Sequence, residues 1–81
     1  MTLEKWLEIA KMAAEYQWGY ADLLKDHPTR FAALYGIKMD PYTAAEEVGE
    51  KYDLVRVDSW NMEPQQRTKE RFYAQFVEQR L

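Results

Sequence analysis

The sequence contains no cysteine, which excludes a disulfide framework and any metal site built from thiolates. It also lacks an apolar run of about 18 residues, the length that a membrane-spanning helix needs. Glu4 and Glu8 interrupt the apolar residues near the N-terminus, so the sequence does not predict a secretory signal peptide. Small secreted domains usually carry disulfides, and we therefore expect a soluble, cytoplasmic protein.

Glycine and proline are also scarce, with three of each in the 81 residues. No segment is rich enough in them to form a linker, and the chain is too short for two domains of ordinary size. We therefore expect one domain over residues 1–81. Aromatic residues make up 15% of the chain. Because each can bury about 150–250 Å², they are expected to supply much of the core.

Apolar residues recur at helical spacing along most of the chain, which predicts a small all-α domain of four helices. The expected helices span roughly residues 2–25, 28–35, 41–53 and 63–81. The first helix has an unusually wide apolar arc and only a narrow polar strip. Such a helix is either central in its bundle or covered by a second chain, so a homodimer is one expectation. Gly19 lies inside this pattern and is the candidate position for a kink or a break.

Residues 40–60 carry the clearest helix start and the densest acidic run. The helix begins either at Asp40, with Pro41 in its first turn, or at Thr43, which opens a capping-box pattern. Gly49 weakens a helix by roughly 1 kcal/mol relative to alanine. We infer that glycine is present because another helix approaches closely at this position.

One face of this helix is apolar, because Ala45, Val48 and Tyr52 recur at helical spacing. The carboxylates on the other face are expected to form a rigid acidic surface. Residues 40–63 contain seven acidic residues and two basic ones, which favours a protein partner with a basic surface over nucleic acid. The chain also has more aromatic residues than we expect its interior to hold, and tyrosine often anchors interfaces. The predicted partner-binding residues are Glu46, Glu47, Glu50, Asp53, Asp58 and Tyr42.

Residues 54–60 interrupt the helical pattern, because apolar and polar residues partly alternate there. A single short strand would need a pairing partner, which only a second chain could supply. We instead favour an irregular or extended segment that places its large apolar residues in the core. These residues are Leu54, Val55, Val57 and Trp60.

The same region offers an alternative, because residues 48–56 loosely resemble a helix-turn-helix. Gly49 falls where such motifs place a small residue, but Asp53 replaces the usual turn glycine. Arg56 is the only cation in the segment that would read DNA, whereas such a segment needs lysine or arginine to contact phosphates. A small helix-turn-helix-like DNA-binding regulator is therefore the alternative function.

The last expected helix is apolar only in its second half. Residues 65–71 contain no apolar side chain, so they are expected to face solvent or a partner. Arg67, Lys69 and Arg71 form a secondary basic surface in this half, which could contact phosphates or an acidic protein.

No motif in the sequence indicates catalysis. His27 is the only histidine, Ser59 lacks the context of a nucleophile elbow, and the carboxylates form no metal-binding pattern. We therefore expect neither an enzyme nor a metal or cofactor site. The leading expectation is a non-catalytic protein-binding module. Small, acidic, aromatic-rich single domains are common among phage-encoded inhibitors of host machinery, so a phage-type inhibitor is the form that we expect.

Overall fold

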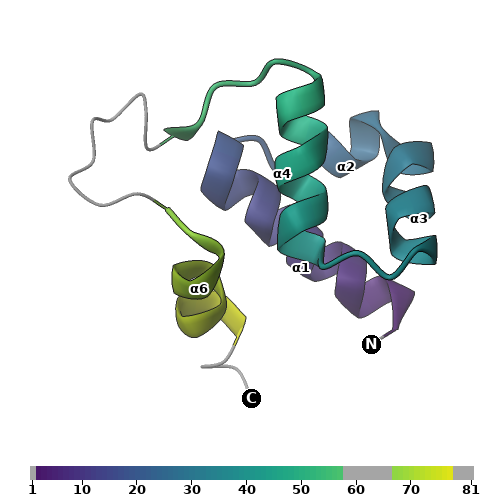
Figure 1. Ribbon diagram of the computed structural model, residues 1–81, viewed down its shortest axis with the longest axis horizontal. Helices are drawn as coiled ribbons and strands as arrows, with labels where there is room; N and C mark the ends of the chain where they lie inside the picture. The colour runs from purple at the N-terminus through teal and green to yellow at the C-terminus, as the bar shows by residue number, and fades with distance from the viewer. Residues whose placement is uncertain (1, 58–66, 78–81) are drawn as a thin grey trace.

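Figure 1 shows the computed structural model of the chain, which describes residues 2–57 and 67–77. Within these two ranges the chain forms helices and no strand, which confirms the all-α prediction. The elements are α1 (Leu3–Trp18), α2 (Leu23–Asp26), α3 (Pro28–Gly36), α4 (Pro41–Lys51), α6 (Lys69–Phe72) and a π-helical turn, η1 (Tyr73–Val77). In this part of the chain, no helix is both long enough and apolar enough to cross a bilayer.

The first helix is shorter than the predicted one over residues 2–25, because α1 ends at Trp18. Gly19 follows in left-handed geometry, with φ 67°, and donates its N–H to the Glu15 carbonyl at 2.9 Å. Glycine adopts this conformation readily because it has no Cβ. Gly19 therefore ends the helix, and α2 forms as a separate short element.

In the turn between α3 and α4, the residue with left-handed backbone geometry is not a glycine. Gly36 is still part of α3, and the residue in left-handed geometry is Lys38, with φ 61°. Asp40 then caps α4, since its carboxylate accepts a hydrogen bond from the Thr43 amide at 3.1 Å. Of the two predicted starts, the one at Asp40 is confirmed, and Thr43 lies inside the helix.

The predicted helix over residues 63–81 is wrong at its N-terminal end. Residues 67 and 68 are not helical, and α6 begins at Lys69. The Thr68 hydroxyl accepts a hydrogen bond from the Arg71 amide at 3.3 Å, so a local cap starts the helix at this point. Residues 63–66 and 78–81 of the predicted helix lie outside the described part of the chain.

The irregular segment after α4 is confirmed over residues 54–56, which have no regular structure. Leu54 packs against the core and Val57 is 8% exposed, as predicted. Val55 is 54% exposed, so the expectation that it fills the core is wrong. Trp60 lies outside the described residues.

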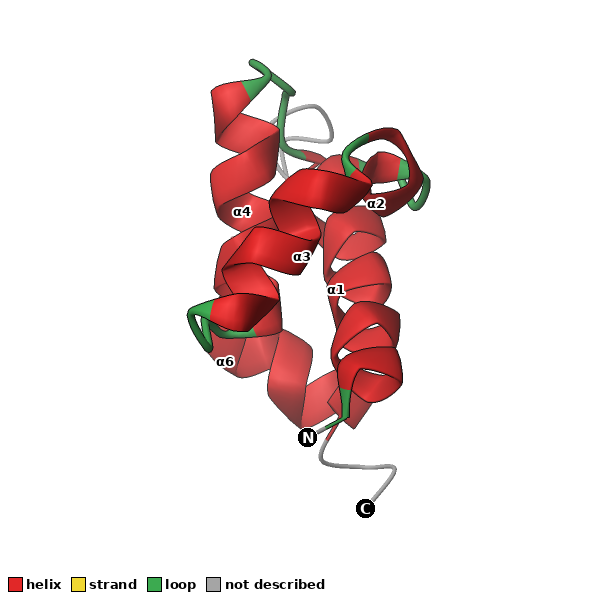
Figure 2. Cartoon of the chain, turned by 90° about the vertical axis from the view of Figure 1, so that its right-hand side faces the viewer, coloured by secondary structure: helices red, strands yellow, loops and turns green. Residues whose placement is uncertain are grey.

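The contact between α1 and α4 is the most extensive one between two helices of the described chain. Figure 2 shows α3 in front of these two helices. Gly49 of α4 lies against the Trp18 indole so closely that a methyl group at residue 49 would sit 2.1 Å from Cε2 of Trp18. The predicted close approach at Gly49 is therefore confirmed.

The C-terminal helix is held in the core by a cluster of aromatic rings. Phe72 is fully buried, and its ring centroid lies 5.5 Å from that of Tyr16 and 5.3 Å from that of Tyr42. Phe76 lies one turn further along, partly buried and 5.5 Å from Phe72. Because Tyr16 belongs to α1 and Tyr42 to α4, Phe72 closes the core across both helices.

Asp40 provides a polar link between the start of α4 and the C-terminal helix. Its Oδ1 accepts a hydrogen bond from the Tyr73 hydroxyl at 2.6 Å, and its Oδ2 lies 3.7 Å from Nζ of Lys69. Burial raises the pKa of Tyr73 well above its ordinary value, and the hydrogen bond to the Asp40 carboxylate raises this pKa further. The neutral phenol is therefore the form that stabilises the contact.

Phe72→Ala should lower the free energy of unfolding by about 3–5 kcal/mol, the usual loss for a fully buried phenylalanine. Phe76→Ala is the comparison on the same helix, and it should lower stability less because Phe76 is only partly buried. Urea unfolding followed by circular dichroism measures both changes. Equal stability of Phe72→Ala and the wild type would show that α6 does not close the core.

The Tyr73 phenol should make the protein less stable as pH rises above about 10, the ordinary tyrosine pKa. The folded pKa is raised, so the unfolded chain releases this proton first and stability is lost as pH rises. Urea unfolding at about pH 8 and about pH 11 should show a larger loss for the wild type than for Tyr73→Phe, which has no such proton. The comparison with Tyr73→Phe removes the contribution of lysine titration, and equal losses in the two proteins would contradict a raised pKa of Tyr73 in the folded protein.

Candidate partner-binding surface

The first two carboxylates of the predicted acidic face are held by arginines. Oε2 of Glu46 lies 3.5 Å from Nη1 of Arg56, and Oε1 of Glu47 accepts a hydrogen bond from Nη2 of Arg30 at 2.7 Å. About two fifths of each glutamate side chain is exposed. These ion pairs fix the positions of the carboxylates and also balance part of their charge.

The C-terminal end of α4 carries acidic residues that no arginine balances. Glu50 and Asp53 are both exposed, and neither forms an ion pair with any residue in 2–57 or 67–77. The helix dipole adds partial negative charge at this end. Glu50 and Asp53 are therefore the carboxylates of this region that have no arginine partner in the described part of the chain, and Lys51 lies between them in sequence.

Two large apolar side chains that neighbour these carboxylates in sequence are also exposed. Tyr52 is 45% exposed and Val55 is 54% exposed. The prediction that Tyr52 continues the apolar face of α4 is wrong, because the helix ends at Lys51. The Tyr52 ring instead stacks on His27, with ring centroids 3.9 Å apart and planes 14° from parallel.

We call the group formed by Glu50, Tyr52, Asp53 and Val55 the α4-end surface. An aromatic residue held in place and flanked by charged residues is typical of protein-binding sites. The periodicity of the sequence did not identify Tyr52 or Val55 as surface residues. Asp53 could have indicated that the helix ends before Tyr52, because aspartate is one of the few residues other than glycine that adopt left-handed geometry. Its φ is 58° in the structure.

One of the predicted partner-binding residues, Tyr42, does not lie on the protein surface. Tyr42 is 2% exposed, and its hydroxyl donates a hydrogen bond to the Arg67 carbonyl at 3.2 Å. Burial raises the pKa of Tyr42. Its ring therefore packs inside the protein, where it contacts Phe72. Asp58 lies outside the described residues.

The predicted secondary basic surface is partly used to hold the fold together. The Arg67 guanidinium lies 5.0 Å from the centroid of the Tyr16 ring, and its Nη1 donates a hydrogen bond to the Tyr16 carbonyl at 2.8 Å. Lys69 lies beside Asp40, whereas Arg71 is exposed. Arg67 is therefore a packing residue, and the expectation that residues 65–71 face only solvent or a partner is wrong at this position.

The structure also bears on the resemblance of residues 48–56 to a helix-turn-helix. The φ of 58° at Asp53 gives the left-handed turn that such a motif makes after its first helix. Gly49, however, is packed against Trp18 of α1, so its small size serves the contact between α1 and α4. The rest of the segment that would read DNA lies outside the described residues.

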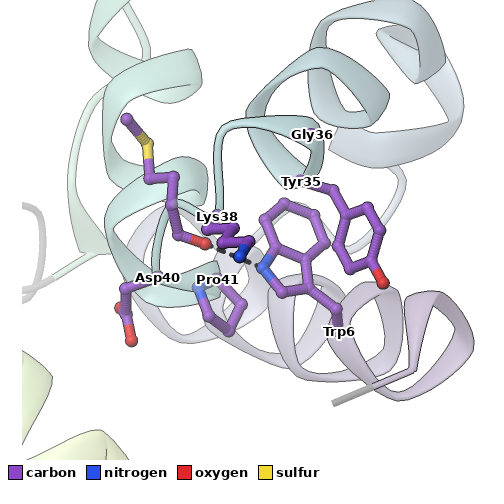
Figure 3. A pocket seen from close by; sticks show the side chains of 7 residues that line it. Trp6, Tyr35, Gly36, Lys38, Asp40 and Pro41 are labelled. Atoms are coloured by element: carbon purple, nitrogen blue, oxygen red, sulfur yellow. Dashed lines mark hydrogen bonds between the residues drawn. The ribbon is translucent and has the colours of Figure 1, made fainter.

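A hollow of about 450 Å³ lies beside Trp6, between α1 and the connection from α3 to α4 (Figure 3). Two of its polar groups are already engaged: the Trp6 indole donates to the Met39 carbonyl at 2.8 Å, and the Asp40 carboxylate holds Thr43 and Tyr73. Among residues 2–57 and 67–77, no cluster of three side chains could ligate a metal ion. The hollow therefore offers no set of free polar groups that converge on one point.

Comparison of the chain with protein-family models, with curated proteins and with solved structures found no match. We therefore infer a function from the chemistry and geometry of the α4-end surface.

Proposed function

We propose that the protein is a non-catalytic protein-binding module, and that its α4-end surface binds a basic region on a partner protein. The observation that carries this proposal is the exposed Tyr52 ring, which is stacked on His27 and has exposed carboxylates on both sides in sequence. Exposed tyrosines surrounded by polar residues are frequent anchors of protein interfaces.

The stacking on His27 supports this proposal because it restricts the Tyr52 side chain before a partner arrives. A side chain that is already ordered loses less conformational freedom on binding, which favours affinity. Val55, three residues further along the chain, adds exposed apolar surface. Together these two side chains would supply the desolvated centre of the interface, which charged residues alone cannot provide.

The carboxylates would contribute mainly to the rate and the specificity of association. Glu50 and Asp53 would act most strongly, since arginines partly balance the charges of Glu46 and Glu47. Asp58 remains part of the proposed acidic set on the strength of the sequence alone. A partner groove lined with lysine and arginine fits this arrangement, including a groove that normally holds nucleic acid. A small inhibitor of the phage type, which occupies such a groove and blocks it, is the specific form that we propose.

A helix-turn-helix-like DNA-binding regulator remains the second candidate, and the left-handed geometry of Asp53 favours it. The charge of the region opposes it, because Glu50 and Asp53 would face the phosphates beside the turn. A duplex-DNA binder must show an affinity that falls steeply with salt. Fluorescence anisotropy with labelled duplex DNA at low and high salt therefore distinguishes the two candidates.

We expect the variant with Glu47→Gln, Glu50→Gln and Asp53→Asn to remain folded and to lose most of its partner binding. Amides keep the shape of the side chains and remove three charges, and exposed substitutions usually change stability by less than about 0.5 kcal/mol each. The measurement is capture of proteins from a cell lysate on the immobilised wild type and variant, with identification by mass spectrometry. A partner of the proposed kind has a basic surface and is released from the wild type by salt.

The matched control is the variant with Glu15→Gln, Asp22→Asn and Glu70→Gln, which removes three exposed charges elsewhere. It should capture the same partner as the wild type. Equal capture by the α4 variant and the wild type would refute the role of the acidic face. Salt-dependent binding of duplex DNA by the wild type would favour the second candidate instead.

A further inference from the structure

An apolar groove of about 500 Å³ runs between the N-terminal half of α1 and the segment formed by α2 and α3. Its apolar lining residues are Leu3, Leu7, Leu24, Pro28, Phe31 and Ala32. Leu3 is 43% exposed, so it adds to the apolar surface that the groove presents. The groove therefore leaves part of the wide apolar arc of α1 uncovered within one chain.

The charges along the rim of this groove change sign along α1. Glu4 and Glu8 line its first part, and Lys11 follows two turns after Glu4. Residues seven positions apart lie on nearly the same side of a helix. Neither Glu4 nor Lys11 forms an ion pair with another residue of the described ranges. Two charges of opposite sign are therefore available on one side of α1.

We propose that a second copy of this chain occupies the groove, with the two α1 helices antiparallel across a two-fold axis. The axis passes α1 between Leu7 and Glu8, so that Glu4 of each copy faces Lys11 of the other. The same contact forms twice, because a two-fold interface brings one surface patch against itself. Leu3 and Leu7 of each copy then cover the groove of the other copy.

The rim charges favour a second copy over an unrelated helix. A surface whose charges were all of one sign would repel itself across a two-fold axis. The signs at residues 4 and 11 are opposite and lie symmetrically about the proposed axis. Glu8, which lies beside the axis, is balanced within each copy by Lys5, whose Nζ is 3.9 Å from its Oε2, so the rim is complementary to itself. The groove shares no residue with the α4-end surface, and a dimer would therefore leave two copies of that surface free to bind partners.

Sedimentation velocity at low salt tests the pairing through a charge swap. The wild type should be dimeric at about 100 µM. Glu4→Lys and Lys11→Glu should each weaken the dimer about tenfold or more, because each replaces two attractive contacts with two repulsive ones. The double variant with both substitutions should recover the wild-type dissociation constant to within about threefold, since it restores opposite charges at both contacts.

A second pair of variants tests the groove itself, with circular dichroism to verify folding. Ala32→Arg places a long charged side chain in the groove and should give a monomer. Ala33→Arg is the matched control, because Ala33 is exposed on the same helix and does not line the groove. A monomeric wild type, a double charge variant as weak as the single ones, or a dimeric Ala32→Arg protein would each overturn the proposal.

Discussion

The contact between Trp18 and Gly49 determines how the two main helices of this protein lie against each other. The indole is 4% exposed and leaves no space for a Cβ at Gly49. The same indole donates its Nε1–H to the Ala45 carbonyl at 3.0 Å, and Gln17 donates to the Tyr42 carbonyl at 2.9 Å. Apolar packing alone is non-directional, whereas these hydrogen bonds fix the rotation and the register of α4 on α1.

The orientation of α4 in turn decides which of its residues reach solvent. Once Ala45 and Gly49 face Trp18, Glu47 and Glu50 must point away from α1. Arg56 extends this arrangement beyond the helix: its guanidinium lies 5.7 Å from the Trp18 ring and beside the Glu46 carboxylate, and it donates to the Arg67 carbonyl at 2.5 Å. The contact made by Trp18 is therefore linked both to the acidic face and to the C-terminal part of the chain.

The sequence predicted the starts of α1, α3 and α4 and the close approach at Gly49 best, because each depends on a few neighbouring residues. Asp40 followed by Pro41 is a local capping signal, and a glycine inside a helix needs a reason in its packing. The helix ends were predicted less well. Periodicity placed Tyr52 on the apolar face by assuming that the helix continued, but the left-handed Asp53 redirects the chain. Periodicity likewise carried the first helix past Gly19.

The remaining errors came from long-range contacts that no local pattern contains. Tyr42 is buried because Phe72, thirty residues away, completes an aromatic cluster around it. Arg67 was assigned to a basic surface, yet it lies on the Tyr16 ring. The interior thus holds more aromatic rings than expected, since they pack against one another. Of the four residues of the α4-end surface, the sequence predicted Glu50 and Asp53. The exposure of the two apolar residues, Tyr52 and Val55, was found only in the structure.

The free energy of unfolding of Gly49→Ala tests the central contact most directly, because two effects predict opposite signs. Helix propensity alone predicts that alanine stabilises α4 by roughly 1 kcal/mol. We predict a loss of about 1–3 kcal/mol, since the added methyl group would overlap the Trp18 ring and force the helices apart. Urea unfolding decides between them, and a Gly49→Ala protein more stable than the wild type would contradict this prediction.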